Sequence, residues 1–268
     1  MLGVSPQPMP TPMSQIDANP TAAVLIVGNE ILSGRTKDAN LPHIAERLGE
    51  IGIRVREARV VADVPEAIVA AVNELRARYT YVFTTGGIGP THDDITSECV
   101  AAAFGVALER NPEAVARLER HYGDPAHLNE ARLRMANVPA GGILVDNPIS
   151  AAPGYQIGNV FVLAGVPNIM QAMLDGILPR LKGGAPIHAR TVSCELAEGK
   201  LAADLGALQE RYPELEIGSY PYFRRGDFGV SLVLRGTDDG LLDRAAEELA
   251  GIVRRLGGMP TVTIGSKG

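Results

Sequence analysis

The sequence predicts an α/β protein: a three-layer αβα domain around a mostly parallel sheet, followed by a small α+β domain. Apolar runs typical of strands buried on both faces alternate with helical segments in the first part of the chain. A Gly- and Pro-containing stretch at residues 182–186 then marks a domain boundary. We therefore expect a flexible tail at residues 1–20, a large domain at residues 21–183 and a small domain at residues 188–260.

The large domain begins with an apolar run at residues 22–27, which predicts a buried strand. Residues 40–50 have apolar side chains at helical spacing, and residues 53–61 alternate like a strand. Pro65 suits the first position of a helix, and residues 81–85 form the third predicted strand. The remaining predicted elements are helices at residues 97–104, 112–122, 125–136 and 168–181, a strand at 143–145 and a hairpin at 155–163.

The second part of the chain has a different order of elements. Strands are expected at residues 189–196, 215–220 and 228–235, and helices at 199–212 and 241–256. This β-α-β-β-α order is typical of a small α+β sandwich.

Composition excludes several classes of partner. The 268 residues carry a formal net charge of −6, which argues against a nucleic-acid surface because such a surface is basic. No apolar run approaches the roughly 18 residues of a membrane helix, so no membrane partner is expected. Cys99 and Cys194 show no metal-ligand spacing, and buried thiols fit a cytoplasmic protein.

The most informative segment is the glycine-rich loop at residues 84–96, which follows a predicted strand and precedes a predicted helix. Glycine lets the backbone approach a ligand, and successive N–H groups with a helix dipole behind them form an anion cradle. The loop predicts a small-molecule phosphorylated ligand, with ligand-binding candidates Thr85, Gly86, Gly87, Gly89, Pro90, Thr91, Asp93 and Thr96.

Carboxylates beside an anion cradle repel a phosphate unless a divalent cation lies between them. Asp93 and Asp94 stand in the loop, and Glu30 and Asp63 follow the first and second strands. Parallel neighbours would bring Glu30, Asp63 and Asp94 to one sheet edge, which predicts a metal-and-phosphate site. Simpler structural alternatives remain for these residues. Asp93 or Asp94 caps the helix at residues 97–104, Asp38 to Asn40 cap the helix at residues 40–50, and Asp63 caps the helix that starts at Pro65. Ser33 then only shapes a turn.

Residues 86–96 (GGIGPTHDDIT) resemble the signature of the molybdopterin-binding (MoaB/Mog) domain. Together with residues 28–34, 38–40 and 61–63, they resemble in particular the amino-terminal domain of the CinA family. The resemblance implies catalytic and metal-binding roles for Asp63 and Asp94, with Mg²⁺ or Co²⁺, and a homo-oligomer (dimer or trimer). It adds as ligand-binding candidates Gly28, Glu30, Ser33, Asp38, Asn40, Pro153, Gly154, Gly165 and Pro167.

Some relatives of that domain, including the one fused to eukaryotic FAD synthases, hydrolyse dinucleotide pyrophosphates such as ADP-ribose or FAD with a divalent metal. The resemblance therefore predicts binding of a phosphorylated pterin (molybdopterin) or an adenine dinucleotide, with metal-dependent pyrophosphatase activity. The alternatives are molybdenum cofactor biosynthesis, by adenylyl transfer or metal insertion, and nucleotide binding without turnover. Asn29 and Ile169 stand where related domains carry Asp and Glu, which weakens the catalytic prediction. The CinA amidase domain does not follow, so nucleotide deamidation is not expected.

Overall fold

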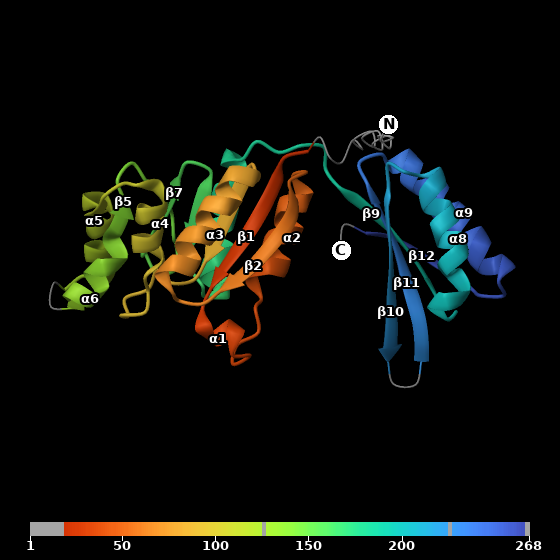
Figure 1. Cartoon of the computed structure of the whole chain (residues 1–268), viewed down its shortest axis with the longest axis horizontal. Coiled ribbons are helices and arrows are strands. Elements are labelled where there is room, and N and C mark those ends of the chain that lie inside the picture. Colours follow the sequence, from red (N-terminus) through yellow and green to blue (C-terminus); the bar gives the residue numbers. More distant parts are fainter. Residues whose placement is uncertain (1–18, 125–126, 225–226, 266–268) are drawn as a thin grey trace, which may run out of the picture. The chain divides into compact units, whose positions relative to one another are not determined.

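The computed structural model describes residues 19–124, 127–224 and 227–265, and it contains two compact units (Figure 1). The first unit spans Pro20–Gly184, and the second begins at Ala185. This boundary lies within the stretch at residues 182–186. Most of the expected tail lies outside the described residues.

The first unit is built on a six-stranded sheet with strand order β2-β1-β3-β8-β7-β6. The first four strands in this order are parallel, and β7 and β6 are antiparallel to their neighbours. The sheet is thus mostly parallel, as predicted. The bounds are β1 Thr21–Val27, β2 Arg54–Val61, β3 Tyr81–Thr85, β6 Ile143–Val145, β7 Gly154–Ile157 and β8 Val160–Leu163.

Helices cover both faces of this sheet, which confirms the three-layer αβα prediction. Helices α2 (Asn40–Glu50) and α7 (Pro167–Ile177) bury apolar side chains against one face. Helices α3 (Pro65–Arg78) and α4 (Thr96–Phe104) do so against the other. Strand β1 serves both cores because alternate residues of a strand point to opposite faces: Val24 faces α2 and Leu25 faces α3.

The carboxyl ends of β1, β2 and β3 meet at one edge of the sheet. In the register, Val27 pairs with Val61 and Ile26 pairs with Thr85. Gly28 and Gly86, which directly follow β1 and β3, therefore lie at the same edge, as the sequence predicts. The short helix α1 (Asn29–Leu32) begins there.

A smaller cluster packs beside α4. It consists of α5 (Pro112–Tyr122), α6 (Glu130–Leu133), the 3-10 helix η3 (Arg134–Ala136) and the paired strands β4 (Leu108–Arg110) and β5 (Asn137–Pro139). The prediction of one helix over residues 125–136 is wrong for its described part. The Asn129 side chain caps α6 by accepting from Arg132 N–H, so the helix begins only at Glu130. A second 3-10 helix, η4 (Leu178–Arg180), follows α7.

The second unit is an antiparallel sheet with helices on one face. Its elements are β9 (His188–Cys194), α8 (Glu198–Arg211), β10 (Glu216–Arg224), β11 (Asp227–Gly236), α9 (Asp239–Arg255) and β12 (Thr261–Gly265). The strand order is β10-β11-β9-β12, and α8 and α9 share one core with the sheet. The β-α-β-β-α order is confirmed, but β12 lies beyond the predicted limit at residue 260.

None of the helices in the described ranges is both long and apolar enough to cross a lipid bilayer.

Candidate functional site

The glycine loop after β3 is held by close backbone contacts. Gly86 has φ 98°, and a side chain there would overlap the carbonyl oxygen of Val27. Gly87 has φ 69°, and a side chain there would overlap the Thr96 hydroxyl. Gly165, from the turn after β8, packs against Gly86 so closely that a Cβ would lie 3.1 Å from the Gly86 Cα. The loop therefore requires glycine for both conformation and packing.

Thr96 joins the loop to the first turn of α4. Its buried hydroxyl donates to the Gly86 carbonyl at 2.9 Å, and its N–H donates to the Gly87 carbonyl at 2.9 Å. Thr96 thus positions the loop. The alternative in which Asp93 or Asp94 caps α4 does not hold, because the cap residue is Ile95 and no described side chain makes a capping hydrogen bond to this helix.

Three successive backbone N–H groups of the loop are unused. Within the described parts of the chain, no hydrogen bond is donated by the N–H groups of Gly87, Ile88 or Gly89. The amides of Ser97 and Glu98 in the first turn of α4 also have no acceptor there. Adjacent free amides at a helix N-terminus form an anion-binding cradle.

The two loop carboxylates fold back on Thr91. Asp94 accepts from the Thr91 N–H at 2.8 Å and lies 2.5 Å from the Thr91 hydroxyl, which is also 2.6 Å from Asp93. The hydroxyl has one proton, so it donates to one carboxylate at a time. The hydrogen bond from the Thr91 hydroxyl is the main cause of the lowered pKa of Asp93. Negative charge therefore stands beside the cradle at neutral pH.

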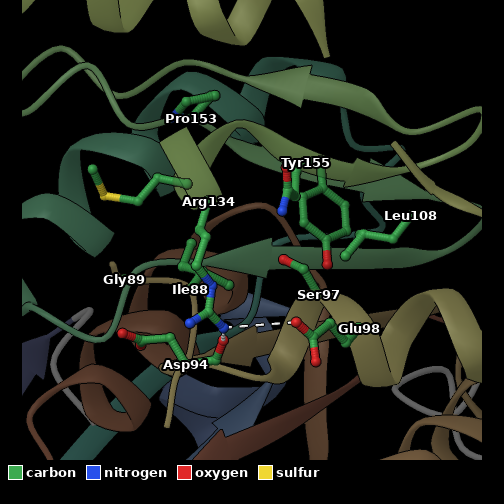
Figure 2. Close-up of a pocket in the computed structure, with 11 residues that line it drawn as sticks. Ile88, Gly89, Asp94, Ser97, Glu98, Leu108, Arg134, Pro153 and Tyr155 are labelled. Atoms are coloured by element: carbon green, nitrogen blue, oxygen red, sulfur yellow. Dashed lines mark hydrogen bonds and ion pairs between the residues drawn. The ribbon is translucent and has the colours of Figure 1, made fainter. Parts of the chain in front are cut away.

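A first pocket, the α4 pocket, lies on the α4 side of the loop and is shown in Figure 2. Arg134 of η3 extends into it toward Asp94, donating to the Asp94 carbonyl at 3.4 Å and lying 3.6 Å from Glu98 Oε1. The fully buried Tyr155 points its hydroxyl toward Ser97, and burial raises the pKa of Tyr155. The lining residues are Ile88, Gly89, Asp94, Ser97, Glu98, Leu108, Arg134, Met135, Asn137, Pro153 and Tyr155.

Sequence reasoning missed Arg134 and Tyr155. Arg134 stands 40 residues after Asp94 in a segment predicted as an ordinary helix, and Tyr155 is one residue of a predicted hairpin. Only the packing of β5, β7 and η3 against α4 brings them to the loop. Arg134 matters because it adds a positive charge beside the carboxylates.

A second pocket, the α2 pocket, is formed at the ends of β1, β3 and β8 and the starts of α2 and α7. The loop contributes Gly86 to the α2 pocket and Ile88 and Gly89 to the α4 pocket, so it borders both. The lining residues are Ile26, Val27, Glu30, Ile31, Thr36, Lys37, Asp38, Ala39, Asn40, Thr85, Gly86, Gly165 and Pro167.

The structure distributes the predicted site residues unevenly. The α2 pocket brings together Glu30, Asp38, Asn40, Thr85, Gly86, Gly165 and Pro167, and the α4 pocket brings together Gly89, Asp94 and Pro153. Neither pocket is lined by Gly28, Ser33, Asp63, Gly87, Pro90, Thr91, Asp93, Thr96 or Gly154.

Several of the predicted polar site residues form hydrogen bonds with nearby backbone groups. Asp38 accepts from the N–H groups of Asn40 at 3.3 Å and Leu41 at 2.9 Å, so it caps the start of α2. Asp63 accepts from the Asn29 N–H at 2.8 Å. The Ser33 hydroxyl donates to the Glu30 carbonyl at 3.2 Å and closes a turn. The simpler alternatives for Asp38 and Ser33 are thus present in the structure.

The strands that precede Glu30, Asp63 and Asp94 end at one edge of the sheet, as predicted, but the three carboxylates do not form a preformed metal site. The described residues hold no group of three or more His, Cys, Asp or Glu side chains placed to bind a metal ion. Asp94 borders the α4 pocket and Glu30 the α2 pocket, on different sides of the loop. Ile169 packs partly buried against the core between the sheet, α2 and α7.

The chain resembles known proteins along most of its length. It is 38% identical over 239 residues to a CinA-like protein of Citrifermentans bemidjiense, covering 85% of this chain and 56% of that protein. It is 38% identical over 245 residues to protein TK1472 of Thermococcus kodakarensis, covering 85% of this chain and 95% of that protein. The chain therefore spans little more than half the length of the CinA-like relative, but nearly all of TK1472.

One solved structure supports the same relationship. The crystal structure of the protein CinA, with unknown function, from Thermoplasma acidophilum superposes with a TM-score of 0.56 and 36% identity. The match covers 60% of this chain and 98% of that one.

Family models divide the chain where the structure does. The model of a probable molybdopterin binding domain matches residues 23–183, and the model of the FAD synthase middle domain matches residues 186–255. The first match covers more than half of the chain and includes the loop and both pockets. The chain belongs to the family of probable molybdopterin-binding domain proteins and is CinA-like.

Proposed function

We propose that this protein binds a phosphorylated pterin or an adenine dinucleotide, with a phosphate on the free amides of Gly87, Ile88 and Gly89. The observation that carries the proposal is that these three amides donate no hydrogen bond within the described residues and belong to a loop that borders both pockets. Groups attached to the phosphate would extend toward these pockets on either side of the loop. Arg134 adds a cation on the α4 side.

A divalent metal, Mg²⁺ or Co²⁺, fits the chemistry of this site. Mg²⁺ is commonly held by one or two carboxylates together with the phosphates of the ligand, so a preformed cluster of three acidic side chains is not needed. Asp94 lines the α4 pocket beside the cradle and supplies a carboxylate of this kind. When bound, the metal would neutralise phosphate charge and polarise the phosphoryl group.

The reaction that we propose is hydrolysis of a pyrophosphate bond in the ADP-ribose or FAD class. Water adds to one phosphorus, the P–O–P bridge breaks, and two phosphate monoesters leave. The loop amides and Arg134 would stabilise the negative charge that develops on the phosphoryl oxygens. Asp94, which lines the α4 pocket, would be the catalytic side chain. The resemblance implies the same role for Asp63, but Asp63 lines neither pocket and accepts from the Asn29 N–H.

The family assignment favours a second candidate, molybdenum cofactor biosynthesis, in which the same cradle would hold molybdopterin phosphate during adenylyl transfer or metal insertion. Binding without turnover is a third candidate, because Asn29 and Ile169 replace carboxylates of related domains.

Thermal shift with ADP-ribose, FAD and molybdopterin, with and without Mg²⁺ or Co²⁺, tests the binding proposal. A ligand at about 100 times its Kd stabilises the folded state by about 2.7 kcal/mol. Chromatography of the ADP-ribose samples for AMP then tests turnover. If none of these ligands raises the melting temperature under any metal condition, the proposal is wrong. Stabilisation by molybdopterin alone would favour the second candidate, and stabilisation by ADP-ribose without AMP release the third.

A further inference from the structure

Two residues that line the α2 pocket, Asn40 and Thr85, each have a buried polar side-chain atom with no hydrogen-bond partner among the described residues: Asn40 Oδ1 and Thr85 Oγ1. Asn40 Nδ2 donates to the Gly165 carbonyl at 2.8 Å. Because only the NH₂ end of the amide can donate to a carbonyl, this bond fixes the side-chain orientation and leaves Oδ1 as the unpaired atom. Thr85 is 1% exposed and lies at the end of β3.

Buried polar atoms are normally hydrogen-bonded, and an unpaired one lowers stability. Asn40 Oδ1 can only accept a hydrogen bond, whereas the Thr85 hydroxyl can donate or accept. Both requirements are met by a group of hydroxyls. Lys37 lines the same pocket, is exposed, and forms no ion pair with any described residue.

The place of Thr85 in the chain narrows the choice of ligand group. Thr85 directly precedes Gly86, so a ligand group that meets Thr85 would lie close to the phosphate on the loop. In a nucleotide that group is the sugar, and the base lies farther away. We propose that Thr85 and Asn40 recognise hydroxyls of a phosphate-linked ribose, with Lys37 beside the phosphate. This inference rests on the function proposed above and makes these two side chains determinants of specificity.

The neighbouring residue provides a matched control. Thr84 is also buried, and its hydroxyl also has no partner. It precedes Thr85 on β3, so its side chain points to the opposite face of the sheet, and it lines neither pocket. Valine replaces either threonine with nearly the same shape and removes only the hydroxyl. Since neither hydroxyl is hydrogen-bonded, we expect neither T84V nor T85V to lower the melting temperature.

Calorimetric titration of the parent, T85V and T84V with ADP-ribose and with inorganic pyrophosphate, each with Mg²⁺, tests the proposal. We expect T85V to bind ADP-ribose about 3- to 10-fold more weakly, the effect of one hydrogen bond. Inorganic pyrophosphate, which has no sugar, should bind T85V and the parent equally, and T84V should match the parent for both ligands. T85S, which keeps the hydroxyl, should restore ADP-ribose binding.

The outcomes separate this inference from the function on which it rests. If T85V binds ADP-ribose as tightly as the parent, or if the substitution weakens the binding of ADP-ribose and of pyrophosphate equally, the assignment of Thr85 is wrong. The proposed phosphate site on the loop is not affected by that result. If the parent binds neither ligand, the proposed function is wrong and the assignment falls with it. If T85V melts at a lower temperature than T84V, the Thr85 hydroxyl has a structural role. That result also overturns the assignment, except where T85S restores ADP-ribose binding without restoring the melting temperature.

Discussion

Thr96 shows how one side chain fixes the site without lining either pocket. Its hydroxyl donates to the Gly86 carbonyl, and its N–H to the Gly87 carbonyl. The sequence predicts Thr96 as a ligand-binding residue because it belongs to the glycine-rich loop. The structure uses that hydroxyl to join the loop to α4.

Thr96→Val tests this role. Valine keeps the branched shape but leaves the Gly86 carbonyl without its donor, so we expect the free energy of unfolding to fall by about 1–3 kcal/mol. Urea denaturation measures the change. Ser33→Ala is the control, because its exposed hydroxyl bonds only to the carbonyl of Glu30 in the same turn. An unchanged unfolding midpoint for Thr96→Val would show that the loop does not depend on this bond.

Asp93 and Asp94 make similar local contacts but differ in position, since only Asp94 lines the α4 pocket. We expect Asp94→Asn to weaken metal-dependent ligand binding more than Asp93→Asn, because it removes charge where metal and phosphate would meet. Calorimetric titration with ADP-ribose, with and without Mg²⁺, measures both variants. Equal losses, or a larger loss for Asp93→Asn, would contradict the prediction. An equal drop in melting temperature would instead indicate that both carboxylates serve only the turn around Thr91.

At the scale of elements, strand β2 is joined to the end of α3 by a cluster around Glu57. Its carboxylate accepts from the Tyr79 hydroxyl at 2.6 Å, forms an ion pair with Arg59 and lies 3.4 Å from Arg78. The bond from Tyr79, followed by that from Arg59, lowers the pKa of Glu57 below its ordinary value of 4.5. The cluster therefore stabilises the fold only while Glu57 is ionised.

The sign of this pH dependence follows from the lowered pKa. The stabilisation is fully present above the unfolded-state pKa, near 4.5, and is lost as pH falls through the lower folded-state value. We expect Glu57→Gln to be less stable than the parent at pH 7, with the difference shrinking at pH values below about 4.5. Urea midpoints from pH 7 to pH 3 measure it. A difference that stays constant with pH would mean that Glu57 titrates in the folded protein as it does in the unfolded chain.

Elements with strong local patterns could be predicted from the sequence. Strands β1 and β3 are apolar runs buried on both faces, and Pro65 and Pro112 occupy the first turns of their helices. The exposed edge strand β12 has no such pattern, because little of it is buried. The loop could be predicted because its glycines, Gly86, Gly87 and Gly89, lie close together in the chain. Arg134 and Tyr155 could not, because only tertiary packing brings them to the loop.

At the scale of the whole molecule, each unit has its own hydrophobic core. Leu232 is fully buried in the core of the second unit, and the cores around the large sheet contain only residues of the first unit. Both pockets are likewise lined by residues of the first unit alone. The two units should therefore respond separately to core substitutions.

Leu232→Ala should destabilise the second unit by about 2–5 kcal/mol, since it leaves a cavity, while the unfolding of the first unit is unchanged. Calorimetric melting should show one transition moving and one staying, and ADP-ribose should bind as in the parent. The reciprocal control, Leu25→Ala, should move only the other transition. A single transition that shifts with either substitution would show that the units unfold as one.

The close contacts of Gly86 with Val27 and Gly165 mean that the cradle has its final shape before a ligand arrives. A loop that becomes ordered only on binding loses conformational entropy at that moment, and its affinity is reduced accordingly. Here the ordering takes place when the sheet and α4 fold. A phosphate bound as proposed would meet a preorganised loop, and discrimination among ligands would fall to the groups that meet the two pockets.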